Sequence, residues 1–145
     1  MDNPIIVMQL PQGKVLIECY PAKAPQHVVQ ILKACENGLY DNTPFHRVIN
    51  GFMAQGGATG QILPQLMAEF NDVEHTEGVC SMARTNEINS ASDQFFICFG
   101  DAKFLDRQYT VWGKVITGMQ HVHAITRGEP PVNPTKIVTM SVLLT

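Results

Sequence analysis

The sequence predicts a mainly β fold, either an antiparallel sandwich or a closed barrel, with two helices as lids. Short runs rich in β-branched and other apolar residues are separated by Gly, Pro and Asn. Only two segments have helical spacing, and they do not alternate with the strands, which argues against a doubly wound α/β fold. The eight expected strands are PIIVMQL (4–10), KVLIECY (14–20), FHRVI (45–49), FMAQG (52–56), VCSMA (79–83), QFFICF (94–99), TVWGKVI (110–116) and KIVTMSVLL (136–144).

The turn and helix signals are local. The first two strands are joined by PQG, in which Gly13 is available for a positive φ, so they predict a hairpin. A first helix is expected over 27–36, because Pro25 suits the first helical turn and Gly38 supplies a stop. A second, shorter helix is expected over 119–126, between two glycines.

Composition and charge limit the classes of function. The chain has 145 residues, so we expect one domain over 1–145 that buries its own core. The net charge is −3 and no run of Lys or Arg occurs, which argues against a nucleic-acid partner. No apolar run approaches the roughly 18 residues that span a bilayer, and the first residues lack a basic region. We expect a cytoplasmic monomer that does not bind membranes.

Motifs for metal, phosphate or hydrolytic sites are absent from the sequence. The glycines at 56, 57 and 60 are not followed by Lys-Ser/Thr, and His121 and His123 have no neighbouring ligands to complete a metal site. No cofactor is therefore expected. Free, buried thiols are predicted for the four widely spaced cysteines, Cys19, Cys35, Cys80 and Cys98.

The stretch PFHRVINGFMAQGG (44–57) places a cation, Arg47, and an amide, Gln55, within two apparently buried strands. Taken alone, Arg47 would more often be a strand residue whose charge reaches solvent. Two further blocks, SMARTNEINSASDQFFICFG (81–100) and FLDRQYTVWGKV (104–115), follow in order. Together the three blocks resemble the cyclophilin family of peptidyl-prolyl cis/trans isomerases. The ending RGEPPVNPTKIV resembles compact bacterial members of that family.

The resemblance implies an eight-stranded closed antiparallel β-barrel capped by two α-helices. It also implies an enzyme that accelerates rotation about X-Pro bonds in flexible protein segments and so assists folding. The X-Pro bond resists rotation by roughly 18–20 kcal/mol, because amide resonance must be broken. In the twisted transition state the prolyl nitrogen becomes a hydrogen-bond acceptor, so a donor aimed at it lowers the barrier.

Arg47 is the catalytic donor that this resemblance implies, since a guanidinium group offers several N–H groups and a permanent charge. Gln55 either orients the guanidinium through its carbonyl or hydrogen-bonds the substrate backbone. The family pocket for the prolyl ring corresponds to Phe52, Met53, Phe96 and Leu105. Strand alternation sends neighbouring phenylalanines to opposite faces and also separates Phe52 from Met53, so the resemblance rather than the pattern places this pocket.

Other residues are expected at the edges of the groove. Ala83 and Arg84 are expected to border it, and Arg84 and Thr85 are expected to affect the preference for the residue before proline. Phe104 stands where many members have a tryptophan that donates to cyclosporin, so we expect weak cyclosporin binding. Tyr109 replaces a frequent histidine and can flank the groove. For His46, a structural role and direct substrate contact remain equal alternatives.

Two alternatives to catalysis remain open from the sequence. The groove could bind proline-containing peptides as a non-catalytic docking or chaperone module. A barrel that carries a small apolar ligand is the other alternative, but large apolar residues in every strand favour a filled interior.

Overall fold

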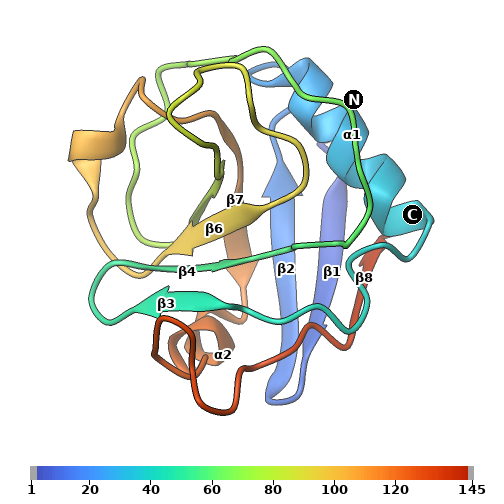
Figure 1. Cartoon of the computed structure of the whole chain (residues 1–145), viewed down its shortest axis with the longest axis vertical. Coiled ribbons are helices and arrows are strands. Elements are labelled where there is room, and N and C mark those ends of the chain that lie inside the picture. The colour runs from blue at the N-terminus through green and yellow to red at the C-terminus, as the bar shows by residue number, and fades with distance from the viewer. Residues whose placement is uncertain (1–2, 144–145) are drawn as a thin grey trace.

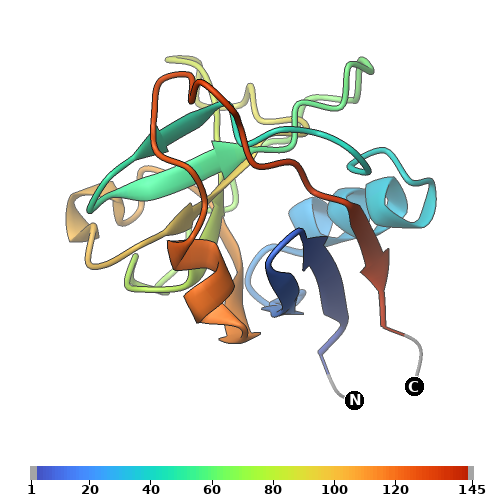
Figure 2. The ribbon, with the colours of Figure 1, turned by 90° about the horizontal axis from the view of Figure 1, so that it is seen from below.

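Eight strands form one antiparallel sheet, in the order β3-β4-β6-β5-β7-β2-β1-β8, in the computed structural model, which describes residues 3–143. Figures 1 and 2 show the curled sheet, with α1 on one side and α2 near the opposite end. The elements are β1 (Ile5–Leu10), β2 (Gly13–Cys19), α1 (Pro25–Glu36), β3 (Arg47–Ile49), β4 (Met53–Gly56), β5 (Val79–Met82), β6 (Phe95–Cys98), the 3-10 helix η1 (Lys103–Leu105), β7 (Val111–Thr117), α2 (Met119–His123) and β8 (Thr139–Val142).

All eight predicted strands and both predicted helices are confirmed, with different ends. The strand expected over 136–144 is the shorter β8, and residue 144 lies outside the described residues. The second helix ends at His123 rather than at residue 126. Its end is set by Arg127, whose Nη1 donates to the carbonyl oxygens of His123 and Ile125 at 2.6 and 2.7 Å. These carbonyls are therefore satisfied by a side chain and not by further helical N–H groups.

A continuous ladder that closes the barrel is not found among the described residues. The edge strands β3 and β8 are not paired with each other; the segments that precede them are joined instead. Phe45 N donates to Thr135 O at 2.9 Å, and Ile137 N donates to Thr43 O at 2.8 Å. Pro44 lies within this contact and has no N–H, so it cannot continue a regular ladder. The sheet is a curled half-barrel whose edges are linked by irregular segments.

Alternation along the strands gives the sheet two different faces. On β6, Phe95 and Ile97 belong to the main core, which the sheet forms with α1. Phe96 and Cys98 belong to a second, smaller cluster on the other face, together with Met53 of β4. Side chains of successive strand residues point in opposite directions, so one strand serves both clusters.

Phe95 is the centre of the main core. Its ring makes edge contacts with Tyr40 at 5.4 Å, Phe45 at 6.3 Å and Trp112 at 5.8 Å between ring centroids. Gly57 follows β4 with a φ of +83°, and a Cβ atom there would lie 2.7 Å from the Phe95 ring. Both the backbone conformation and the ring contact therefore require glycine.

A distant carboxylate caps the start of α1. Ala24, at the N-cap position, has no side chain that can accept a hydrogen bond. Glu69 takes this role, since its carboxylate accepts from the backbone N–H groups of Gln26 at 3.1 Å and His27 at 2.9 Å. Its Oε1 also lies 2.6 Å from Nδ1 of the buried His27 ring. The loop after β4 is thereby tied to the helix.

A second buried histidine supports the smaller cluster. His75 stacks on Phe96 with the ring centroids 6.1 Å apart, and its Nδ1 and Nε2 lie 2.9 Å from Asp106 Oδ1 and Ser81 Oγ. Burial lowers the pKa of His75 and that of His27, although their carboxylate partners oppose the shift. Burial alone would raise the pKa of Asp106, but hydrogen bonds from His75 outweigh it and lower that pKa.

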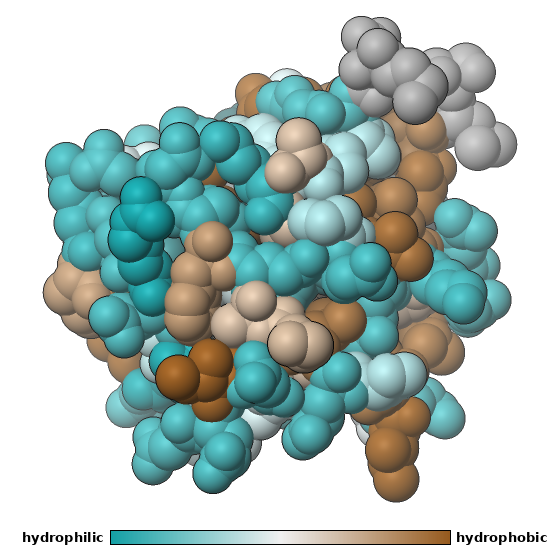
Figure 3. All heavy atoms as spheres, turned by 90° about the horizontal axis from the view of Figure 1, so that it is seen from above, coloured by the Kyte–Doolittle hydropathy of each residue, from teal (hydrophilic) through white to brown (hydrophobic). Residues whose placement is uncertain are grey.

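The four cysteines are free and buried, as the sequence predicts. Burial raises the pKa values of Cys19 and Cys98 to about 12, which makes both thiols unreactive. Within residues 3–143 no helix has the length and apolar character needed to cross a bilayer. The end of the molecule that carries the long loops is largely hydrophilic, with apolar residues in small, separated groups (Figure 3).

Replacement of Gly57 by alanine is expected to destabilise the protein much more than the same change at Gly60. Gly60 has a φ of +79° but no atom within 4 Å of the added Cβ, so Gly60→Ala costs about 1–2 kcal/mol of backbone strain. Gly57→Ala adds the displacement of the Phe95 ring, a further cost of about 1–3 kcal/mol. Urea unfolding of both variants measures the difference, and equal losses would contradict the proposed ring contact.

The free energy of unfolding is expected to fall as the pH drops from about 7.5 to about 5.5, because unfolded histidines take up protons below about 6.5. His27 and His75 have lowered pKa values in the fold, so they stay neutral over part of this range. Each contributes a slope of at most about 1.4 kcal/mol per pH unit. Asp106 contributes in a separate, more acidic window: its pKa is lowered in the fold, so its stabilising effect is present above the ordinary pKa of 3.8 and is lost at lower pH.

Urea unfolding at the two pH values checks this, with His27→Gln and His75→Gln as variants. Each substitution removes one buried imidazole and should flatten the pH dependence. A wild-type protein that is equally stable at both pH values would refute the assignment of neutral, buried histidines.

Candidate active site

A groove of about 300 Å³ lies on the face of the smaller cluster. Ten of the eleven predicted site residues line it, and they come from β3, β4, β6, η1 and the segments beside them. These residues are Arg47, Phe52, Met53, Gln55, Ala83, Arg84, Phe96, Phe104, Leu105 and Tyr109. The structure thus brings together side chains that are spread over 63 positions of the sequence, from 47 to 109.

The register of four neighbouring strands places the central residues in one row. Arg47 of β3 is paired with Gln55 of β4, and Gln55 is paired with Phe96 of β6. Phe96 is in turn paired with Ser81 of β5. Directly opposed residues on adjacent strands share a face of the sheet. The row therefore runs from a cation, through an amide, to an aromatic ring and the hydroxyl that contacts His75.

Arg47 is held at the polar end of this row. Its side chain is 49% exposed, its Nη1 donates to Gln55 Oε1 at 3.4 Å, and its Nε donates to Glu129 Oε1 at 3.2 Å. Gln55 is itself oriented by Gln94, because Gln55 Nε2 donates to Gln94 Oε1 at 3.1 Å. Of the two alternatives for Gln55, the structure shows the carbonyl facing the guanidinium.

Apolar side chains form the other end of the groove. Phe96 and Leu105 are buried, and Tyr109 meets Phe96 edge-on, 5.7 Å between centroids. Phe104 is 72% exposed at the rim, and its ring centroid lies 5.6 Å from that of Phe52. Phe52 and Met53 both line the groove because Phe52 precedes β4, where strand alternation does not apply.

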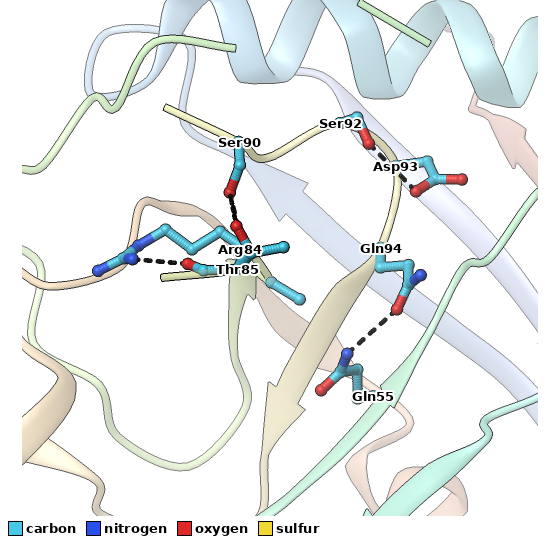
Figure 4. A pocket seen from close by; sticks show the side chains of 8 residues that line it. Gln55, Arg84, Thr85, Ser90, Ser92, Asp93 and Gln94 are labelled. Carbon is cyan, nitrogen blue, oxygen red and sulfur yellow. Dashed lines mark hydrogen bonds between the residues drawn. The ribbon is translucent and has the colours of Figure 1, made fainter. Parts of the chain in front are cut away.

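Arg84 separates this groove from a neighbouring cavity. Its guanidinium lies 4.7 Å from the centroid of the Tyr109 ring, and its Nη2 donates to Gln108 O at 2.7 Å. The second cavity, also about 300 Å³, shares three residues with the groove and is otherwise lined by hydroxyl, amide and carboxylate side chains. Figure 4 shows the paired Gln55 and Gln94 on one side and the side chains of Thr85 and Ser90 on the other.

His46 is the one predicted site residue that does not line the groove. It directly precedes Arg47, and neighbouring residues of an extended chain point to opposite sides. Three residues beside the site were not predicted, namely Gln94, His75 and Glu129. Gln94 lies within the block 81–100 and Glu129 within the ending RGEPPVNPTKIV, but their partners are 39 and 82 residues away, so only the fold reveals their contacts.

No cluster of three or more His, Cys, Asp or Glu side chains suited to a metal occurs within the part of the chain that the structure describes. The polar groups of the groove are instead the guanidinium groups of Arg47 and Arg84 and the amide of Gln55. Arg47 donates to Gln55, and Arg84 donates to the backbone carbonyl of Gln108. Such a site can bind an apolar ring and donate a hydrogen bond beside it.

Known proteins are similar to this chain in sequence. Residues 5–142 match the family model described as "Cyclophilin type peptidyl-prolyl cis-trans isomerase/CLD". The "Probable peptidyl-prolyl cis-trans isomerase" of Brucella abortus is 39% identical over 159 aligned positions, which cover 94% of this chain and 81% of the relative. Peptidyl-prolyl cis-trans isomerase B of Escherichia coli is 38% identical over 128 positions, 78% of each chain.

Solved structures agree with these sequence matches. A cyclophilin from Hirschia baltica superposes with a TM-score of 0.90 and 33% identity, over 96% of this chain and 73% of that one. A Cryptosporidium parvum cyclophilin-type isomerase, solved in the presence of the dipeptide Ala-Pro, shares the fold with a TM-score of 0.88 and 22% identity, over 97% and 99% of the two chains. The chain therefore belongs to the cyclophilin-type peptidyl-prolyl cis-trans isomerase family and is an enzyme of that activity.

Proposed function

We propose that Arg47 catalyses rotation about X-Pro bonds by donating a hydrogen bond to the prolyl nitrogen of the twisted transition state. The observation that carries this proposal is the row from Arg47 through Gln55 to Phe96, which sets a charged donor next to an apolar slot. In the planar ground state the prolyl nitrogen is a very poor acceptor, so this contact favours the transition state selectively.

The apolar end of the groove holds the prolyl ring while the residue before proline rotates. Phe52, Met53 and Leu105 surround the ring, and Phe96 forms the floor, supported from below by His75. Gln55 keeps the guanidinium pointed along the row, since its amide group is anchored on Gln94. A ten-thousandfold acceleration needs only about 5–6 kcal/mol of differential stabilisation.

We propose proline-containing segments of flexible or unfolded proteins as the substrates. The groove is half-open rather than enclosed, because Arg47 and Phe104 at its two ends remain exposed. An extended substrate chain can cross the groove while the substrate residues next to the proline reach the polar cavity beyond Arg84. No proton transfer occurs in the reaction, so no titrating base is assigned.

Arg47→Ala is expected to lower kcat/KM for a short Ala-Pro peptide by about 100- to 1000-fold, the range found when a preorganised donor is removed. Arg47→Lys should recover only part of this loss, since an ammonium group lacks the planar array of N–H donors. NMR exchange or a coupled protease assay measures the rates, and circular dichroism shows that the fold is intact.

The exposed Lys33 on α1 supplies a control, and Lys33→Ala should leave the rate unchanged. An Arg47→Ala variant as fast as the wild type would contradict the proposed role of Arg47. A folded wild type without any acceleration would favour the binding module instead.

Cyclosporin is expected to bind more weakly than the nanomolar range, because Phe104 offers no N–H at the rim of the groove. The variant Phe104→Trp restores an indole donor and should strengthen binding about three- to tenfold, the usual net value of one hydrogen bond. Calorimetric titration of both proteins measures this, and nanomolar binding by the wild type would contradict it.

A further inference from the structure

Arg47 has a second polar partner, Glu129, on the segment that follows α2. The two side chains form an ion pair, with Arg47 Nε donating to Glu129 Oε1 at 3.2 Å. We propose that Glu129 is a positioning residue for the reaction, which holds the guanidinium plane so that its remaining N–H groups face the groove. This inference rests on the proposed function of Arg47.

The backbone places Glu129 directly across from Arg47. Val48 and Gly128 form an isolated antiparallel bridge, in which each N–H donates to the other carbonyl at 2.8 Å. In an antiparallel pair the residue before Val48 therefore faces the residue after Gly128, and side chains at such a position lie close together. Figures 1 and 2 both show this segment running alongside β3.

Arg127 anchors the same segment. Its Nε donates to Asn50 Oδ1 at 3.2 Å, and its guanidinium lies 4.1 Å from the centroid of the Phe99 ring. Its Nη1 donates to the carbonyl oxygens at the end of α2. The segment that carries Glu129 is thus held to Asn50 and Phe99 as well as to the end of α2. The position of Glu129 relative to Arg47 is therefore set by the fold.

The two partners of Arg47 leave the catalytic donors free. Glu129 takes the N–H of Nε, which lies behind the tip of the side chain, and Gln55 takes one N–H of Nη1. The N–H groups of Nη2 and the second N–H of Nη1 stay available to substrate. Two contacts in different directions define the plane of the guanidinium. Without Glu129, a half-exposed arginine would have to be ordered during each turnover.

The test compares Glu129→Ala and Glu129→Gln with the wild type on an uncharged Ala-Pro peptide. We expect Glu129→Ala to lower kcat about three- to tenfold with little change in KM, since orientation and not binding is lost. The kcat of Glu129→Gln should lie between those of the wild type and Glu129→Ala, because an amide oxygen can still accept a hydrogen bond from Arg47 Nε. The control is Asp72→Asn, which removes another exposed carboxylate, paired with Lys23 at 2.7 Å. It should leave kcat unchanged.

Two further readouts separate positioning from a structural role. The Nε–H resonance of Arg47 should exchange slowly with solvent in the wild type and rapidly in Glu129→Ala. In an Arg47→Ala background, Glu129→Ala should cause no additional loss of rate, because its effect passes through Arg47.

The outcomes distinguish the two proposals. Loss of activity in Arg47→Ala with an unchanged or faster Glu129→Ala would overturn the positioning role of Glu129 and leave the role of Arg47 standing. A fully active Arg47→Ala would overturn both, because Glu129 would then have no catalytic group to position.

Discussion

The register of the β3-β4-β6-β5 ladder is the constraint on which the rest of the site depends. It lines up Arg47, Gln55, Phe96 and Ser81 on one face of the sheet. Strand side chains alternate, so a slip of one residue between β3 and β4 would move Arg47 to the other face. The main core makes such a slip costly, because Val48, the neighbour of Arg47, is buried in it.

Core and groove are built on alternate residues of the same strand, β6, which makes the groove rigid. Phe95 packs among Tyr40, Phe45 and Trp112, while Phe96 next to it forms the floor of the groove. The floor cannot move without disturbing the core, and this suits a mechanism based on a prearranged donor. Gly57 belongs to the same arrangement, since it lets the chain leave β4 close to the Phe95 ring.

Polar contacts over long sequence distances hold the irregular segments around the sheet. Glu69 caps α1, Asp106 and Ser81 contact the buried His75, and Glu129 reaches Arg47. Each of these contacts joins side chains or backbone groups of two different segments, which holds both segments in place. Arg47 is half-exposed, but its side chain is restrained because it has partners on two sides.

The sequence by itself determined the strands, the helices, the family and nearly all residues of the groove, because alternation, turn residues and three ordered motifs are local features. It placed Phe96 in the groove only through the resemblance, since periodicity alone separates Phe95 from Phe96 without saying which faces the core. Tertiary structure decided the polar partners. Gln94, Glu129 and His75 contact residues 39, 82 and 31 positions away, and no local pattern reports such pairings. It also decided how the barrel edges meet, because Pro44 breaks the ladder there and leaves irregular segments to join them.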